Sequence, residues 1–265
     1  MKDENIYSYT PNGMNQKIWR VCPDPKSDLI ALEIREKKEQ NNLSQLLILD
    51  SSKKKVIGTA RMEATQTLLN FFDKTLLLTE IDIHNELPIS KGIQALNTHF
   101  ETIWQLEEVS YYDIIEEENQ ENKVIFSLQS DYYSVPLKPI SEEVEAEEEI
   151  YNVLKNKVKK HFYLTHEYLT NHENYKDISD FIEEKTQHKT EETIFYTENE
   201  NYVVCSYLVE NENYLLCTDK NGKLKKHFLI KELGENTEKK NPQELILMQN
   251  KILWMNENGL SMISL

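Results

Sequence analysis

Residues 91–106, KGIQALNTHFETIWQL, constrain the fold of this chain most, because they read as two strands joined by a turn. Apolar and polar residues alternate on both sides of residues 97–99, where the pattern breaks as a chain reversal requires. Ala95 lies in the first strand and Trp104 in the second. A small side chain beside a large ring suits stacked sheets, because the ring fills the gap between the layers. The stretch therefore predicts antiparallel sheets that stack, with Ala95 and Trp104 in structural roles.

The same stretch resembles the quinoprotein-type (PQQ-like) repeat of β-propellers, in which a strand ending in Ala-Leu-Asp is followed by a Thr-Gly turn and a strand containing Trp. Residues 92–97, GIQALN, and residues 103–104, IW, take the corresponding places. The copy departs from the repeat in having Asn97 for the Asp and residues 99–100, HF, where the Gly is usual. The resemblance implies a β-propeller. It implies no cofactor, because we find no matching set of quinone or calcium ligands.

The order of segments over most of the chain is also similar to an uncharacterised bacterial domain family of about this length. The similarity includes residues 18–20 (IWR), residues 23–25 (PDP) and the central residues 91–93 (KGI). That family brings no known activity with it.

Alternating hydrophobicity predicts a mainly β chain with about five irregular blades, and six or seven remain as alternatives. Tight turns such as Asn221-Gly222 separate the strands. The strands of the five blades are predicted within residues 17–60, 67–106, 109–137, 193–231 and 244–265.

The last of these blades lacks one strand. Residues 259–264, GLSMIS, match residues 92–97, so a partner like residues 103–104 should follow them, and the best remaining match is Ile18 with Trp19. Pairing the first strand with the last removes two open sheet edges. The sequence therefore predicts one closed domain over residues 1–265, in which Trp19 is buried against the last blade.

Residues 141–190 interrupt the strand pattern and predict a small helical insertion. Apolar residues recur at helical spacing over residues 141–159 and again over residues 177–186. The first of these segments is strongly acidic. A docking surface for a partner with a basic surface would use Glu147, Glu148 and Glu149, although a solvated helix face is the commoner explanation of such a run.

A cluster of histidines is a weak candidate for a metal site. His161, His166 and His172 lie near Glu167 and Glu173, but separations of five and six residues do not align ligands on one face of a helix or strand. A polar surface loop is therefore favoured. Elsewhere no phosphate-binding glycine loop or nucleophile elbow is found, and the catalytic residues stay unknown.

Two cysteines on neighbouring predicted strands, Cys205 and Cys217, could lie close together. Buried thiols that act as small apolar side chains are favoured over a redox or metal pair.

Charge and composition limit the function classes. A formal net charge of −16 repels phosphate backbones and anionic membranes, so neither nucleic acid nor a membrane is an expected partner. The first ten residues lack the apolar core of a signal peptide, and three cysteines without a CxxC pair suit a reducing compartment, so we expect a cytoplasmic protein. Since a fold alone supplies no chemistry, the expected function is a non-enzymatic interaction module. The alternative is a hydrolase-like enzyme with a carboxylate–His site at the mouth of the ring.

Overall fold

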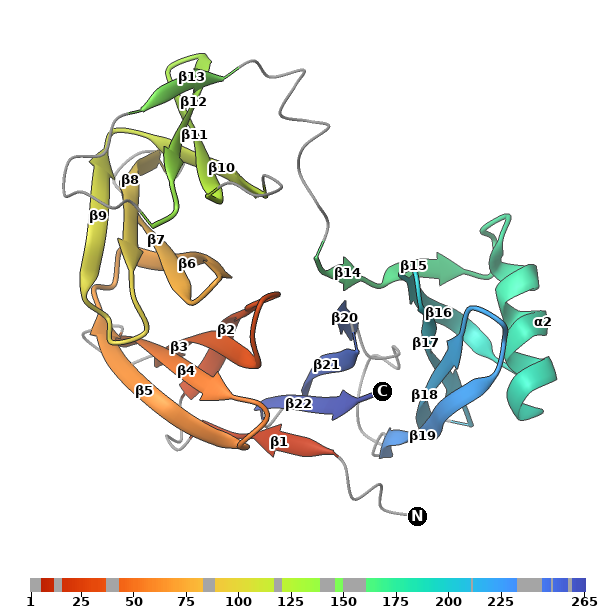
Figure 1. The fold of residues 1–265 in the computed structure, drawn as a ribbon. Helices are drawn as coiled ribbons and strands as arrows, with labels where there is room; N and C mark the ends of the chain where they lie inside the picture. Colours follow the sequence, from red (N-terminus) through yellow and green to blue (C-terminus); the bar gives the residue numbers. More distant parts are fainter. Residues whose placement is uncertain are drawn as a thin grey trace. The chain divides into compact units, whose positions relative to one another are not determined.

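In a computed structural model, the described residues form five antiparallel sheets and one helix (Figure 1). The mainly β class predicted from the sequence is confirmed. The chain divides into two compact units, residues 11–160 and residues 1–10 with 161–265. The structure describes residues 6–11, 16–36, 43–82, 89–116, 121–138, 146–149, 161–210, 212–232, 245–248, 250–256 and 259–265.

Residues 11–160 contain three four-stranded sheets, in each of which neighbours in the chain are neighbours in the sheet. The first sheet consists of β2 (Gln16–Pro23), β3 (Leu29–Glu36), β4 (Leu43–Asp50) and β5 (Lys55–Met62). The second consists of β6 (Gln66–Phe72), β7 (Thr75–Asp82), β8 (Ile89–Leu96) and β9 (Thr102–Glu107). The third consists of β10 (Ser110–Ile115), β11 (Lys123–Leu128), β12 (Asp131–Pro136) and β13 (Glu147–Glu149).

The other unit contains two five-stranded sheets. The fourth sheet consists of β15 (His166–Leu169), β16 (Glu191–Glu198), β17 (Tyr202–Val209), β18 (Glu212–Asp219) and β19 (Leu224–Glu232). The fifth has the order β1 (Tyr7–Tyr9), β22 (Gly259–Ser264), β21 (Lys251–Asn256), β20 (Leu245–Met248) and β14 (Tyr163–Leu164).

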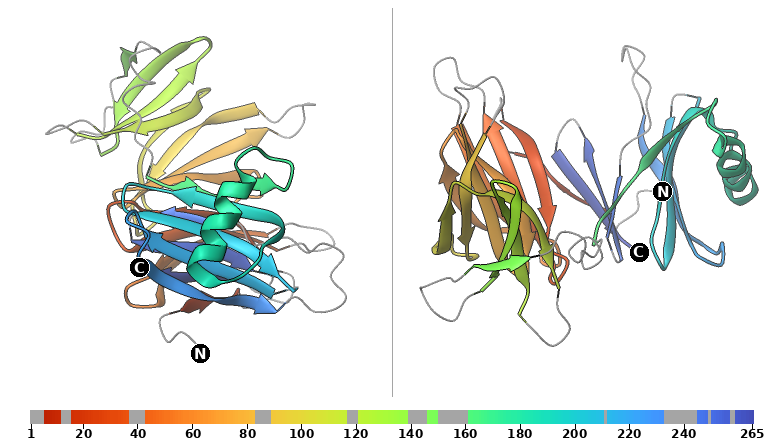
Figure 2. Two further views of the ribbon diagram at one scale, coloured as in Figure 1. Left: turned by 90° about the vertical axis from the view of Figure 1, so that its right-hand side faces the viewer. Right: turned by 90° about the horizontal axis from the view of Figure 1, so that it is seen from above.

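The helix α2 (Tyr175–Thr186) confirms the prediction over residues 177–186 and lies against one face of the fourth sheet (Figure 2). Its fully buried Ile182 belongs to an apolar cluster with Ile194 of β16 and Tyr207 of β17. Neither α2 nor any other helix in the described part of the chain is long and apolar enough to cross a membrane.

The strand–turn–strand signal at residues 91–106 is confirmed by β8 and β9. Ala95 lies directly opposite Trp104, and both side chains are buried. The Trp104 ring packs in an apolar cluster that joins the second sheet to the third, and its Nε1 donates a hydrogen bond to the Leu137 carbonyl oxygen at 3.1 Å. The ring therefore fills the space between two layers, as its pairing with alanine predicts.

Two glycines at matching places let a neighbouring strand approach closely. A Cβ atom on Gly92 (φ 143°) would lie 2.1 Å from the Leu106 carbonyl oxygen, and one on Gly259 (φ 146°) would lie 1.9 Å from that of Tyr9. The predicted match of residues 259–264 to residues 92–97 therefore has a structural counterpart. β1 pairs with β22 and approaches its glycine closely, just as β9 pairs with β8 and approaches Gly92.

The prediction that Ile18 and Trp19 complete the last sheet is wrong. β2 pairs with β3, from Gln16 opposite Glu36 to Pro23 opposite Ile30, and the Trp19 side chain is 60% exposed. The strand that pairs with β22 is β1, which lies before the first predicted strand range, residues 17–60. Three residues are too few to show an alternating pattern, so no strand is predicted there.

The predicted helix over residues 141–159 is also wrong where the structure describes it. Glu147, Glu148 and Glu149 form β13, an edge strand that pairs with β12. Pairing satisfies backbone groups of β12, whereas like charges three and four residues apart would destabilise a helix. Residues 141–145 and 150–159 of this prediction lie outside the described residues.

We expect Gly259→Ala and Gly92→Ala each to lower the free energy of unfolding by more than about 1 kcal/mol, because the new methyl group meets a backbone carbonyl and the positive φ is strained. Urea denaturation measures the change. Gly222→Ala is the matched control: its φ is 75°, but a Cβ there would meet only the flexible end of Lys185 at 3.2 Å. Equal stability of all three variants would contradict the close approach.

Candidate functional site

The histidines proposed from the sequence as weak metal ligands are distributed over several elements. His166 lies on β15, opposite Tyr196, while His172 lies in the turn before α2, where its Nδ1 accepts a hydrogen bond from the Asn174 N–H at 3.1 Å. His161 precedes β14. Within the described ranges, no group of three or more His, Cys, Asp or Glu side chains is placed to hold a metal ion.

Cys205 and Cys217 are fully buried in two different apolar clusters. Cys205 packs beneath α2, whereas Cys217 packs with Trp254 of the fifth sheet. Burial raises the pKa of both thiols, that of Cys217 to about 12. The two side chains therefore pack as small apolar groups in separate clusters.

The acidic side chains of β13 are partly engaged by their neighbours. Glu149 Oε1 accepts a hydrogen bond from the Ser134 hydroxyl at 2.9 Å, and Glu147 forms an ion pair with Lys123. This ion pair holds the pKa of Glu147 below its usual value. Two of the three proposed docking glutamates thus already have partners.

The exposed Trp19 is the centre of a surface that we call the basic–aromatic patch, made of Lys17, Trp19, Arg20 and Arg35. The register of β2 against β3 shifts between Ile18 and Arg20, which is a β-bulge at Trp19. The Arg35 guanidinium carbon lies 4.7 Å from the centre of the indole ring, which is a cation–π contact. Bulges turn individual side chains out of a sheet, which accounts for an indole in contact with solvent here.

A buried carboxylate holds this patch from beneath. Glu33 of β3 is 0% exposed, and its Oε1 accepts a hydrogen bond from Arg35 Nε at 2.6 Å. Its Oε2 accepts hydrogen bonds from the Thr67 hydroxyl at 2.8 Å and the Leu68 N–H at 2.9 Å, both on β6. Arg20 adds a hydrogen bond from Nη1 to the Leu68 carbonyl oxygen at 2.9 Å. Hydrogen bonds to the first and second sheets, which belong to one unit, therefore hold both guanidinium groups in place.

The sequence predicted Trp19 as a core residue, and the structure places it on the surface. Two of its neighbours in β2, Lys17 and Arg20, are exposed cations. This flanking by charge is a sequence signal against a buried ring, and the prediction based on the match to residues 103–104 did not take it into account.

A second polar cluster was missed entirely. The buried Tyr207 hydroxyl lies 3.2 Å from Nδ1 of His188 and 3.0 Å from Nε2 of His227. These residues come from β17, from the segment after α2 and from β19, so their sequence spacing gives no sign of contact. One hydroxyl carries one proton, so it can donate to only one of the two imidazoles and accepts from the other or from both.

The surroundings of this cluster disfavour a charge on His227 or on Tyr207. Tyr214 of β18 stacks on the His227 ring with its hydroxyl donating to Glu212, and His188 lies against both rings. Burial, and secondly the proximity of His188, lower the pKa of His227, while burial raises the pKa of Tyr207. The cluster is therefore a hydrogen-bonded tie between the segment after α2 and the fourth sheet.

We expect this tie to weaken in acid. A histidine with a lowered pKa in the folded state contributes stability above its unfolded pKa of about 6.5, and loses that contribution as the pH falls toward the folded value. Chemical denaturation between pH 7.5 and 5 should therefore show a fall in stability that is smaller in His227→Gln. His99→Gln, at an exposed turn, is the control. Identical pH profiles for the wild type and His227→Gln would contradict this role.

Comparisons with known proteins do not establish a family. No protein-family model and no curated protein matches the chain. Among solved structures, a prolyl endopeptidase matches with 8% identity and a TM-score of 0.35, over 93% of this chain but only 40% of the other. AztD from Citrobacter koseri matches with 6% identity and a TM-score of 0.29, over 92% of this chain and 85% of the other. Saccharomyces cerevisiae Sqt1 matches with 7% identity and a TM-score of 0.29, over 96% of this chain and 86% of the other. Likenesses this weak carry no argument about fold or function.

Proposed function

We propose that this protein is a non-enzymatic interaction module on a five-bladed propeller scaffold, and that its basic–aromatic patch binds an acidic segment of a partner protein. Two observations support the scaffold: each of the five sheets is an antiparallel set of four or five strands, and β1 pairs with the last strand, β22. The same glycine contact recurs in the second and fifth sheets, as expected of a repeated unit.

One observation carries the binding function: an indole that is 60% exposed is stacked with a guanidinium that a fully buried carboxylate holds in place. The core of the sheets does not need this indole. Trp and Arg dominate the binding energy of protein interfaces, and side chains that are already fixed lose little entropy when a partner binds.

The charges of the patch indicate the chemistry of the partner. Arg35 contacts the indole, Lys17 is paired with Arg35 across the two strands, and Arg20 follows Trp19 in β2. The carboxylate of Glu33 is buried. The patch is thus locally basic on a chain whose formal net charge is −16. Because an exposed ion pair alone is worth under about 1 kcal/mol, recognition also needs an apolar or aromatic group against Trp19. An acidic segment that contains an aromatic residue fits both requirements.

Two functions suggested by the sequence, docking of a basic partner and hydrolase-like catalysis, stay predictions. A basic partner on Glu147, Glu148 and Glu149 would have to compete with the existing contacts of Glu147 and Glu149. A hydrolase-like site would need a carboxylate–His pair, whereas the histidine cluster described above is centred on a tyrosine hydroxyl.

A fluorescein-labelled peptide with one Phe between two pairs of Glu tests the proposal by fluorescence anisotropy. We expect it to bind, to bind less tightly as salt is raised, and to lose at least tenfold in affinity, about 1.4 kcal/mol, with Trp19→Ala or Arg35→Gln. Ile57→Ala is the matched control, because Ile57 is 44% exposed on β5 of the same sheet. Unchanged affinity in Trp19→Ala, or tighter binding of the corresponding Lys peptide, would overturn the proposal.

A further inference from the structure

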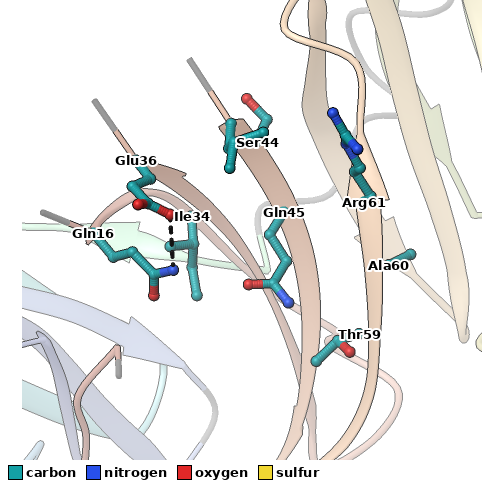
Figure 3. A pocket seen from close by; sticks show the side chains of 9 residues that line it. Gln16, Ile34, Glu36, Ser44, Gln45, Thr59, Ala60 and Arg61 are labelled. Atoms are coloured by element: carbon teal, nitrogen blue, oxygen red, sulfur yellow. Dashed lines mark hydrogen bonds between the residues drawn. The ribbon is translucent and has the colours of Figure 1, made fainter. Parts of the chain in front are cut away.

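A pocket of about 270 Å³ lies on the first sheet (Figure 3). Among the described residues, those that line it come from β2, β3, β4 and β5. The side chains that line it include Gln16, Ile34, Glu36, Gln45, Thr59 and Arg61.

This pocket is separate from the basic–aromatic patch. Gln16 pairs with Glu36 and the next residue, Lys17, pairs with Arg35. Because successive side chains of a strand point to opposite faces, Gln16 and Glu36 project from the face opposite to Lys17 and Arg35. A ligand in the pocket would therefore not compete with a peptide at Trp19.

The pocket carries opposite charges on two walls. Glu36 of β3 lies on one wall, where Gln16 Nε2 donates a hydrogen bond to its Oε2 at 3.4 Å. Arg61 of β5 lies on the other wall, and among the described residues no carboxylate or hydrogen-bond acceptor engages its guanidinium. Figure 3 shows Gln45 between the two walls. Its register, opposite both Ile34 and Arg61, places its amide on the floor of the pocket.

The distance between the walls limits the ligand. Glu36 and Arg61 are on strands separated by β4, two strand spacings or about 9.6 Å apart. Arg61 is level with Ile34, and Glu36 lies two residues further along β3, so the two backbones are about 12 Å apart. Ligand charges that sit on adjacent carbons cannot reach both walls well, whereas charges several bonds apart can. A volume of 270 Å³ is also small for a nucleotide-sized ligand.

We propose that this pocket binds a small zwitterion whose charged ends are several bonds apart, such as a dipeptide. Its carboxylate pairs with the Arg61 guanidinium, which can donate two parallel hydrogen bonds, and its ammonium pairs with the Glu36 carboxylate. The Gln16 and Gln45 amides supply donors and acceptors for the peptide group between them. The apolar Ile34 side chain lies beneath the pocket and is itself almost fully buried.

Isothermal titration calorimetry with glycylglycine and two analogues tests this assignment. N-acetylglycylglycine lacks the ammonium and glycylglycinamide lacks the carboxylate, so both should bind at least tenfold more weakly than glycylglycine. Glycine, whose charges are adjacent, should also bind more weakly. Absence of heat with millimolar glycylglycine, or equal binding of all four probes, would overturn the proposal.

Two variants assign the walls individually. Glu36→Gln should bind glycylglycine and its acetylated form equally, and Arg61→Gln should bind glycylglycine and its amide equally. Lys55→Gln removes an exposed charge from the same edge strand and should leave all affinities unchanged. Thermal melting checks that each variant is folded. Discrimination that survives in folded Glu36→Gln or Arg61→Gln would contradict the assigned roles.

Discussion

The fifth sheet depends on one backbone contact, in which β1 lies so close to Gly259 that a Cβ atom would be 1.9 Å from the Tyr9 carbonyl oxygen. Only glycine permits this approach, and the approach joins the start of the chain to its last strand. The Ser8 and Ser261 hydroxyls, 2.8 Å apart, form a second tie across the same pair of strands. The sheet edge that β22 would otherwise expose is thereby covered.

Buried carboxylates play the corresponding role between the first and second sheets. Asp24, which is 0% exposed, accepts hydrogen bonds from the backbone N–H groups of Asp73 at 2.8 Å and Lys74 at 3.0 Å, in a tight turn with positive φ at both residues. Glu33 joins β3 to β6 in the same way and also orients Arg35. Since removing one partner of a buried charge is costly, the patch at Trp19 is built on groups that the fold itself requires.

The sequence predicted the strands well, because most have six to nine residues and end at clear turns. It failed where a short segment or a distant partner decides the structure. β1 has too few residues to alternate, and β13 is a strand because β12 offers it backbone partners, although its three glutamates resemble a helix face. Trp19 was expected in the core because residues 18–19 match residues 103–104, but β2 pairs with β3 instead. The contact of Tyr207 with His188 and His227 depends on the packing of α2 and on pairing across β18, which no local pattern encodes.

A disulfide cross-link tests most directly whether the N-terminal strand completes the last sheet. The pair Ser8→Cys and Ser261→Cys replaces two hydroxyls in contact, so mild oxidation should join the peptides that contain residues 8 and 261, as detected by mass spectrometry after proteolysis. The matched pair Trp19→Cys and Ser261→Cys should give no such link. A link from position 19 and none from position 8 would contradict the account, because it would return β2 to the edge of the last sheet.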